Sequence, residues 1–542
     1  MVKLFVAVLV AALTSCAAFG QASRSGARSC ESLAQLALPN AKVTAAQEVA
    51  AGAFTPPPAS EMGPPRGGAA FYATLPKFCR VSITGTPSAD SDIKIEVWLP
   101  SSGWNGKLHG EGNGGFAGEI DYHSMGVALL QGYATAGTDT GHSASVPGAS
   151  WATGHPEKLI DYGYRGIHQM TQLAKAAIEA FYGNNAQRSY FTSCSNGGRE
   201  ALMEAQRFPA DYDGIIAGAP ANFWTHLLTN AIANAQATTL DPLSYIPASK
   251  LPAIAQAVNA ACDAKDGVTD GVLNDPRKCH FEPVTLLCKV SDSDSCLTAP
   301  QLAALKKLYA GAHDSHGHEI FPGYLPGAED GPGGWAPWIT GTAPGKSLLF
   351  FFGVGYFSGM VYEKADWNYK DANLDEILKA ADEKTARILN SADPNLAPFK
   401  ARGGKLIIYH GWNDAAISAL NSINYYDSVV AKLGLHDTES FVRLYMVPGM
   451  QHCGGGPGAT SFVQRHADAP NDSQHSAQEA IEEWVEKGVA PSTIIATKYV
   501  GDDPSKGVKM TRPLCPYPLA AKYKGTGDTN DAANFVCAAE SK

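Results

Sequence analysis

The sequence is poor in charge and has no long hydrophobic segment. Charged residues make up 17% of its 542 positions, and acids outnumber bases to give a formal net charge of −10. Lysine and arginine form no cluster that would follow a phosphate backbone, so we expect no nucleic-acid partner. No run reaches the ~20 apolar residues that cross a bilayer, so we expect no transmembrane segment. The 45% of hydrophobic residues is typical of a globular protein, and the length predicts two or three domains.

The N-terminus has the pattern of an export signal. Lys3 is followed by a short apolar run over residues 4–14 and then by small residues, which predicts a signal peptide over residues 1–22. The protein is therefore expected to be secreted or held in the cell envelope. An alternative within this prediction is a lipid anchor, because residues 13–16 (LTSC) resemble a bacterial lipobox ending at Cys16.

The cysteine count agrees with export. Eleven cysteines are present, and loss or lipidation of Cys16 leaves an even number, which predicts five disulfides in an oxidising compartment. Short separations favour three pairs: Cys262–Cys279, Cys288–Cys296 and Cys515–Cys537. Spacing leaves the partners of the other four open: Cys30, Cys79, Cys194 and Cys453.

Strand and helix patterns alternate in two separate stretches of the chain. Period-two and apolar runs predict strands over 93–99, 132–136, 188–192, 214–217, 405–409 and 441–447. Apolar residues at helical spacing predict helices over 167–182, 199–208, 417–433 and 477–487. This alternation predicts an α/β fold with a parallel sheet between helices. It stops near residue 221, so we expect a core of 23–221 and 396–542, interrupted by an inserted lid domain over 222–395.

The first chemical signal is a serine between a predicted strand and a predicted helix. Ser195 lies in the segment 193–199 (SCSNGGR), which is close to the Gly-x-Ser-x-Gly turn that carries the nucleophile of α/β-hydrolases. Ser193 stands where that pattern has its first glycine. The alternative is a glycine-rich turn with an incidental serine.

An acid and a histidine follow the serine in the order that this fold uses. Asp414 comes directly after the strand at 405–409, and His452 comes after the strand at 441–447. Carboxyl ends of parallel strands meet at the edge where α/β proteins bind ligands. We therefore predict a catalytic triad of Ser195, Asp414 and His452. A disulfide between the neighbouring Cys194 and Cys453 would hold the serine beside the histidine, although either cysteine could pair elsewhere.

Two further segments carry predicted site residues. The oxyanion of an acyl-transfer reaction needs two backbone N–H donors, for which we expect Asn196 and either Gly114 or Gly115 in the loop 110–116 (GEGNGGF). In the inserted segment, residues 262–272 interleave acids with glycines. Oxygen ligands of this kind suit Ca²⁺, so we expect a calcium site formed by Asp263, Asp266, Asp270 and the carbonyl groups of Val268 and Val272. The alternative is a solvated acidic turn.

These motifs together resemble the tannase and feruloyl esterase family, which includes mono(2-hydroxyethyl) terephthalate hydrolases. The resemblance lies in the segment 194–199, in Asp414, in His452-Cys453 and in the acidic loop 263–272. It implies an α/β-hydrolase core, a lid with a structural Ca²⁺ ion, and disulfides Cys194–Cys453 and Cys30–Cys79. The implied activity is hydrolysis of small esters of hydroxycinnamic or gallic acids. A lid arginine that would bind the carboxylate of a terephthalate monoester could not be matched in this sequence.

Other functions remain as alternatives to this interpretation. They are a terephthalate monoester hydrolase, a serine peptidase of the same fold, and a catalytically silent binding protein stabilised by calcium. The hydrophobic run 348–352 (LLFFF) is expected to form core of the inserted segment, or else the wall of an aromatic pocket.

Overall fold

The structure is a computed structural model that describes residues 28–57, 67–143, 148–463 and 472–539. The predicted signal peptide over residues 1–22, with Cys16, lies outside these residues. No helix in the described ranges is long and apolar enough to cross a membrane.

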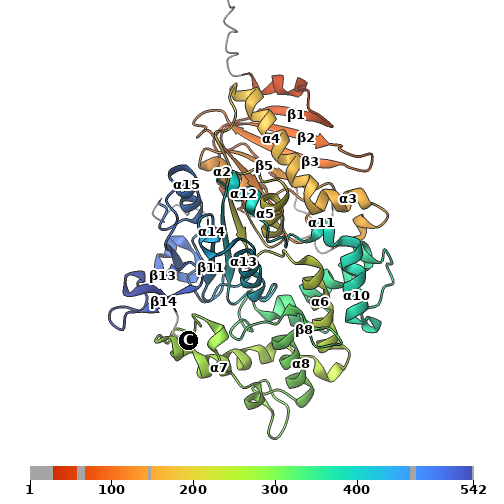
Figure 1. Ribbon diagram of the computed structural model, residues 1–542, viewed down its shortest axis with the longest axis vertical. Coiled ribbons are helices and arrows are strands. Elements are labelled where there is room, and N and C mark those ends of the chain that lie inside the picture. Colours follow the sequence, from red (N-terminus) through yellow and green to blue (C-terminus); the bar gives the residue numbers. More distant parts are fainter. Residues whose placement is uncertain (1–27, 58–66, 144–147, 464–471, 540–542) are drawn as a thin grey trace, which may run out of the picture.

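A mixed sheet of nine strands forms the centre of the protein (Figure 1). Its order is β1-β2-β3-β5-β4-β6-β7-β10-β11. The strands β1 to β3 and β5 pair antiparallel, whereas all pairs from β5 to β11 are parallel. The strands are β1 Ala41–Val49, β2 Phe78–Gly85, β3 Ile93–Pro100, β4 Lys107–Glu111, β5 Ala134–Thr138, β6 Arg188–Cys194, β7 Gly214–Gly218, β10 Lys405–Gly411 and β11 Val442–Val447.

Helices cover both faces of this sheet because successive side chains of its strands point to opposite faces. Ile215 and Ile408 pack on one face with α4 (Gly166–Tyr182), α5 (Asn196–Arg207) and α13 (Leu420–Leu433). Their neighbours Ile216 and Ile407 pack on the other face with α2 (Tyr122–Leu130) and α15 (Ala477–Lys487). Short helices complete the core: α1 Gly68–Tyr72, α3 Pro156–Ile160, α12 Ala397–Ala401 and α14 Leu435–Glu439. Because the sheet is buried on both faces, its strands are apolar runs, and these runs are what predicted it.

The chain between β7 and β10 leaves the sheet and forms a largely helical unit in the lower part of Figure 1. Its two short strands, β8 (Gly311–His313) and β9 (Glu319–Pro322), pair with each other. The helices are α6 Trp224–Thr239, α7 Leu251–Cys262, α8 Ala299–Ala310, α9 Leu348–Gly355, α10 Leu374–Ala381 and α11 Arg387–Leu389. This is the segment in which the sequence predicted an insertion.

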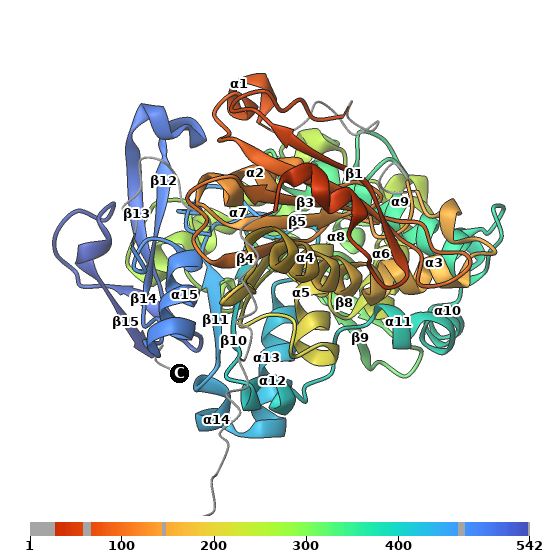
Figure 2. The same cartoon turned by 90° about the horizontal axis from the view of Figure 1, so that it is seen from above.

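Two antiparallel hairpins follow the core and stand together at one edge of Figure 2. They pair β12 (Ile494–Tyr499) with β13 (Val508–Leu514) and β14 (Leu519–Tyr523) with β15 (Phe535–Ala539). Val268 of the inserted segment packs against Phe535, and the side-chain amide of Asn274 donates to the carbonyl of Ala521 at 2.8 Å. The C-terminal hairpins therefore hold the predicted calcium loop against the core.

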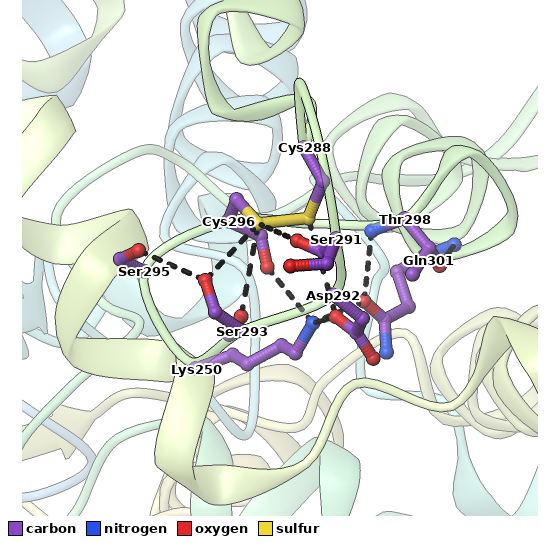
Figure 3. Close-up of a disulfide and its surroundings, with 9 residues drawn as sticks. All are labelled: Lys250, Cys288, Ser291, Asp292, Ser293, Ser295, Cys296, Thr298 and Gln301. Carbon is purple, nitrogen blue, oxygen red and sulfur yellow. Dashed lines mark hydrogen bonds and ion pairs between the residues drawn. A yellow bond between two sulfur atoms is a disulfide. The ribbon is translucent and has the colours of Figure 1, made fainter.

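Five disulfides cross-link the described chain, and they include the three pairs that spacing favoured. The structure joins Cys30–Cys79, Cys194–Cys453, Cys262–Cys279, Cys288–Cys296 and Cys515–Cys537. Figure 3 shows how the exposed loop closed by Cys288–Cys296 is fixed from inside. The buried ammonium group of Lys250 reaches Asp292 and donates to the carbonyl of Cys296 and the amide oxygen of Gln301. A buried lysine is tolerated here because each donor has an acceptor.

Candidate active site

The predicted nucleophile lies on a sharp turn between β6 and α5. Ser195 has φ 66° and ψ −124°, and a positive φ costs a non-glycine residue free energy. The glycines beyond it are required by close approach. A Cβ atom on Gly197 would lie 1.8 Å from the Ser193 hydroxyl, and one on Gly198 would lie 2.2 Å from the carbonyl of Gly218. The turn therefore keeps the hydroxyl of Ser195 outside both β6 and α5.

The three residues of the predicted triad form one continuous hydrogen-bonded chain. The Nε2 atom of His452 lies 2.9 Å from the hydroxyl of Ser195, and its Nδ1 atom lies 2.8 Å from a carboxylate oxygen of Asp414. Each residue follows the carboxyl end of a parallel strand: β6, β10 and β11. These distances match a base within reach of a nucleophile and an acid that orients the base.

The carboxylate of Asp414 is buried and receives four donors. Its Oδ1 atom accepts the backbone N–H groups of Ala416 and Ile417 at 2.8 and 2.9 Å. Its Oδ2 atom faces both His452 and the fully buried His410, whose Nε2 atom lies 3.2 Å away. Burial alone would raise the pKa of Asp414, but the two histidines outweigh it and hold the pKa below its ordinary value. Sequence reasoning missed His410, since a histidine inside a strand carries no catalytic signal of its own.

A disulfide joins the residues next to the serine and the histidine. The Cα atoms of Cys194 and Cys453 lie 5.9 Å apart. Cys453 has a positive φ of 61°, so the chain turns sharply directly after His452. The bond therefore ties the two turns that carry the triad, although 259 residue positions separate the cysteines.

The loop after β4 lies against the nucleophile turn because β4 and β6 are neighbours in the sheet. Asn196 is the first residue of α5, so no intrahelical carbonyl accepts its backbone N–H. In the loop, Gly114 is exposed, and Gly115 is half-buried with φ 54°. The carbonyl of the next residue, Phe116, lies 2.7 Å from the Nε2 atom of buried His142. The loop approaches the start of α5, where a Cβ atom on Gly197 would lie 3.1 Å from the carbonyl of Asn113, but this does not distinguish Gly114 from Gly115.

A buried network that the sequence did not predict connects this loop with α5. The hydroxyl of Tyr162 lies 3.0 Å from both the carbonyl of Gly115 and the side-chain oxygen of Asn196. The carboxylate of Glu200 accepts the backbone N–H of Asn113 at 2.9 Å and the side-chain amide of Asn196 at 3.0 Å. The only sequence signal was Gly112, where a Cβ atom would lie 2.6 Å from the Glu200 carboxylate.

The inserted segment brings aromatic side chains to the triad. The ring of Trp338 meets the ring of His452 edge-on, with centroids 4.9 Å apart. The ring of Phe352, in α9, meets the ring of Phe116, in the loop 110–116, with centroids 5.0 Å apart. The expectation that residues 348–352 form core was wrong in part: Leu349 is buried, but Phe351 is 39% exposed and Phe352 is only partly buried. Helix α9 runs along the surface of the segment, so only one side of this run packs inward.

The carboxylates of the predicted calcium loop accept hydrogen bonds from the loop's own backbone. The carboxylate of Asp263 accepts the N–H of Gly271, that of Asp266 accepts the N–H of Val268, and that of Asp270 accepts the N–H of Val272. Asp270 also receives the guanidinium group of Arg512, in β13, at 2.6 Å. In the described part of the chain, no donor lies on the carbonyl of Val268 or of Val272, although both residues are buried. Carboxylates and backbone carbonyl groups are oxygen ligands of the kind that Ca²⁺ prefers.

Comparison with known proteins identifies the family. A family model described as tannase and feruloyl esterase matches residues 79–538. This chain belongs to that family. It is 42% identical to an uncharacterised esterase of Xanthomonas campestris, over 95% of this chain and 92% of that protein. It is 34% identical to the mono(2-hydroxyethyl) terephthalate hydrolase of Piscinibacter sakaiensis, over 87% and 86% of the two chains.

A solved structure extends this similarity to the whole fold. Feruloyl esterase B of Aspergillus oryzae superimposes with a TM-score of 0.84 at 28% identity, over 94% of this chain and 99% of that one. The predicted α/β-hydrolase fold is confirmed. As a member of the tannase and feruloyl esterase family, the protein is a carboxylic ester hydrolase.

Proposed function

We propose that this family member is a serine carboxylesterase in which Ser195 is the nucleophile, His452 the general base and Asp414 the residue that orients it. One observation carries the proposal. The hydroxyl of Ser195, on a strained turn, is hydrogen-bonded to His452, which is hydrogen-bonded to a buried and charged Asp414. A histidine that is oriented by a carboxylate can take the proton of a serine hydroxyl and so activate it at neutral pH.

The mechanism follows from these positions. His452 takes the proton of Ser195 as the hydroxyl attacks the ester carbonyl, and Asp414 stabilises the imidazolium that forms. The N–H of Asn196, together with one from Gly114 or Gly115, holds the negative charge on the carbonyl oxygen. The imidazolium then protonates the departing alcohol and leaves an acyl group on Ser195. Water, deprotonated by His452, releases the acid and restores the serine.

The substrate that we propose is a small ester of an aromatic acid of the hydroxycinnamic or gallic type. Two observations support this choice. Trp338 and Phe352 extend from the inserted segment to the triad and the loop 110–116, where an aromatic acyl group would stack on them. A solved structure that covers nearly the whole chain is that of a feruloyl esterase. A terephthalate monoester is the alternative that the 34% identical relative suggests.

We also propose that the loop at residues 263–272 holds Ca²⁺ through Asp263, Asp266, Asp270 and the carbonyl groups of Val268 and Val272. The ion would neutralise acids that Arg512 alone does not balance. Its role is to stabilise the loop, which lies far from the triad in the sequence. Five disulfides further support the proposal that the protein is exported.

A hydrolysis screen tests the proposed activity. The purified protein and its Ser195→Ala variant are compared on methyl ferulate, methyl gallate and a terephthalate monoester, with calcium present. We expect the native protein to hydrolyse at least one of the first two esters fastest and the variant to hydrolyse none. Preference for the terephthalate monoester would replace the proposed substrate class, and activity that survives Ser195→Ala would overturn the mechanism.

A further inference from the structure

Three groups of metal-ligating side chains lie outside the proposed calcium loop in the described residues, and a covalent bond or a neighbouring cation speaks against two of them. Cys288, Asp292 and Cys296 meet on one loop, but both sulfur atoms are joined in a disulfide and offer no thiolate. A second group, with His168 and Asp211, lies between α4 and α5, where the ammonium group of Lys175 lies 2.5 Å from the backbone carbonyl of Asp211. A cation next to the carboxylates disfavours a second cation there.

The third group occupies the turn between β8 and β9. Asp314, His316 and His318 each place one ligand atom within 4.8 Å of the others. Both imidazoles are exposed, at 77% and 80%, and both turn their Nδ1 atom towards the same Oδ2 atom of Asp314, at 3.9 and 2.9 Å. In a tetrahedral zinc site with bonds of about 2.1 Å, neighbouring ligand atoms lie about 3.4 Å apart. The observed distances lie on either side of that value.

The turn holds the carboxylate in place independently of the histidines. The other oxygen of Asp314, Oδ1, accepts the backbone N–H groups of His316 and His318, both at 2.8 Å. The backbone N–H of Ser315 is bound by the carboxylate of Asp375, in α10, at 3.1 Å. Metal-ligating carboxylates are commonly fixed in this way, with one oxygen hydrogen-bonded and the other directed at the ion.

We propose that Asp314, His316 and His318 form a surface site for a divalent transition metal such as Zn²⁺, separate from the calcium loop. Two imidazoles and one carboxylate suit Zn²⁺, whereas Ca²⁺ prefers oxygen ligands alone. Three protein ligands leave the fourth position to water. The ion would cross-link the tip of the hairpin, and it takes no part in ester hydrolysis.

Zinc binding to the calcium-loaded protein tests this site. Isothermal titration at pH 8 compares the native protein with H316N/H318N and with the control H436N/H475N. The control removes an exposed histidine and one that is paired with Asp472 at 2.7 Å, as His318 is paired with Asp314. We expect one Zn²⁺ bound per native or control chain, and at least tenfold weaker binding by H316N/H318N, with hydrolysis unchanged in all three. Equal binding by all three proteins, or none by the native protein, would overturn the proposal.

A second and independent observation concerns Glu200, whose carboxylate joins the two halves of the proposed oxyanion hole. Glu200 is 1% exposed and lies one helical turn after Asn196. Its two oxygens accept one hydrogen bond from each half: the backbone N–H of Asn113 and the side-chain amide of Asn196. Gly112 lets this contact form, since any side chain there would displace the carboxylate.

We infer that Glu200 is a positioning residue that sets the distance between the N–H of Asn196 and those of Gly114 and Gly115. This inference rests on the proposed serine esterase function. Both of its partners are N–H donors, so Glu200 has to accept a hydrogen bond on each of its two oxygens. Glutamine has one acceptor oxygen and one amide donor, so Glu200→Gln would set a donor against a donor on one side. The two halves would then move apart, and the developing charge would lose part of its stabilisation.

The effect of Glu200→Gln on kcat and KM tests this role, with Glu204→Gln as the control on the same helix. Glu204 is equally buried, at 1% exposure, but it lies a further turn from the loop. We expect Glu200→Gln to lower kcat about tenfold to a hundredfold with KM nearly unchanged, and to weaken binding of a boronic-acid transition-state analogue by the same factor. Glu204→Gln should change neither.

The outcomes separate this inference from the proposed function. If Glu200→Gln hydrolyses esters as fast as the native protein, or if Glu204→Gln is impaired equally, the positioning role is wrong. Native activity that depends on Ser195 would still stand in either case. If the native protein shows no activity that depends on Ser195, the proposed function itself fails.

Discussion

The proposed triad and the proposed calcium loop are both formed by tight turns, but they are assembled from very different lengths of chain. Ser195, Asp414 and His452 come from turns after three separate strands, and their geometry depends on the register of the whole sheet. The calcium loop lies within residues 263–272, and its carboxylates bind its own backbone N–H groups. Chemistry therefore depends on the packing of distant strands, whereas the carboxylates of the loop are placed mainly by the loop's own backbone. Changes to the first should remove activity, and changes to the second should remove stability.

The largest expected effect follows from the change Asp414→Asn. An amide cannot stabilise the imidazolium of His452, and its NH₂ group would favour the wrong tautomer of the ring. We expect kcat to fall about ten-thousandfold on the best ester of the screen, as for the acid of other such triads. The measurement is steady-state hydrolysis, with circular dichroism to show that the variant is folded. A fall of less than about tenfold would mean that Asp414 does not orient the base.

Removing the disulfide beside the triad comes next. Cys194→Ala with Cys453→Ala releases the tether between the turns of Ser195 and His452, and a displacement of about 1 Å can lower the rate about a hundredfold. The matched control, Cys515→Ala with Cys537→Ala, removes a disulfide of the C-terminal hairpin and should lower stability with little effect on turnover. Both are assayed well below their melting temperatures. Equal losses of turnover, or no loss in either variant, would show that the Cys194–Cys453 disulfide stabilises the fold but does not position Ser195 and His452.

Calcium removal should lower stability more than it lowers activity. Because an ion that binds only the folded state stabilises it by mass action, chelation should lower the melting temperature by several degrees. The initial rate at moderate temperature should change less than twofold. Asp266→Asn should abolish most of the calcium-dependent shift in melting temperature. Immediate loss of activity on chelation, with the fold intact, would remove the distinction between the two regions.

The smallest expected effect concerns the buried carboxylate of Asp139, measured at a constant calcium concentration. Burial raises the pKa of Asp139, at the end of β5, from 3.8 to about 7. Its folded state therefore binds a proton more tightly than its unfolded state, and the resulting stability is lost as the pH rises through about 7. Asp139→Asn keeps an acceptor for the N–H groups of Lys94 and Gly141. Denaturant unfolding gives the free energy of unfolding of both proteins. From pH 5 to pH 9, the difference between them should shift in favour of the variant by about 1–2 kcal/mol. A difference independent of pH would contradict this.

The sequence predicted the parts of the site that follow directly from strands. Ser195, Asp414 and His452 each come after an apolar run, and their order in the chain is diagnostic for the fold. Helix ends were less well defined: α5 begins at Asn196 rather than Arg199, because glycines at its start hide the helical pattern. Contacts between distant segments left no pattern to find. Examples are the ring of Trp338 against His452 and the carboxylate of Glu200 on Asn113.

The most direct test of the central claim is to locate the nucleophile chemically. The calcium-loaded protein is treated with a fluorophosphonate probe, which labels serines activated by a neighbouring base, and the modified peptide is identified by mass spectrometry. The account predicts a single adduct on Ser195, formed at a rate that parallels the loss of esterase activity and abolished by His452→Ala. An active protein that is not labelled, or one whose inactivating label lies on another residue, would contradict it.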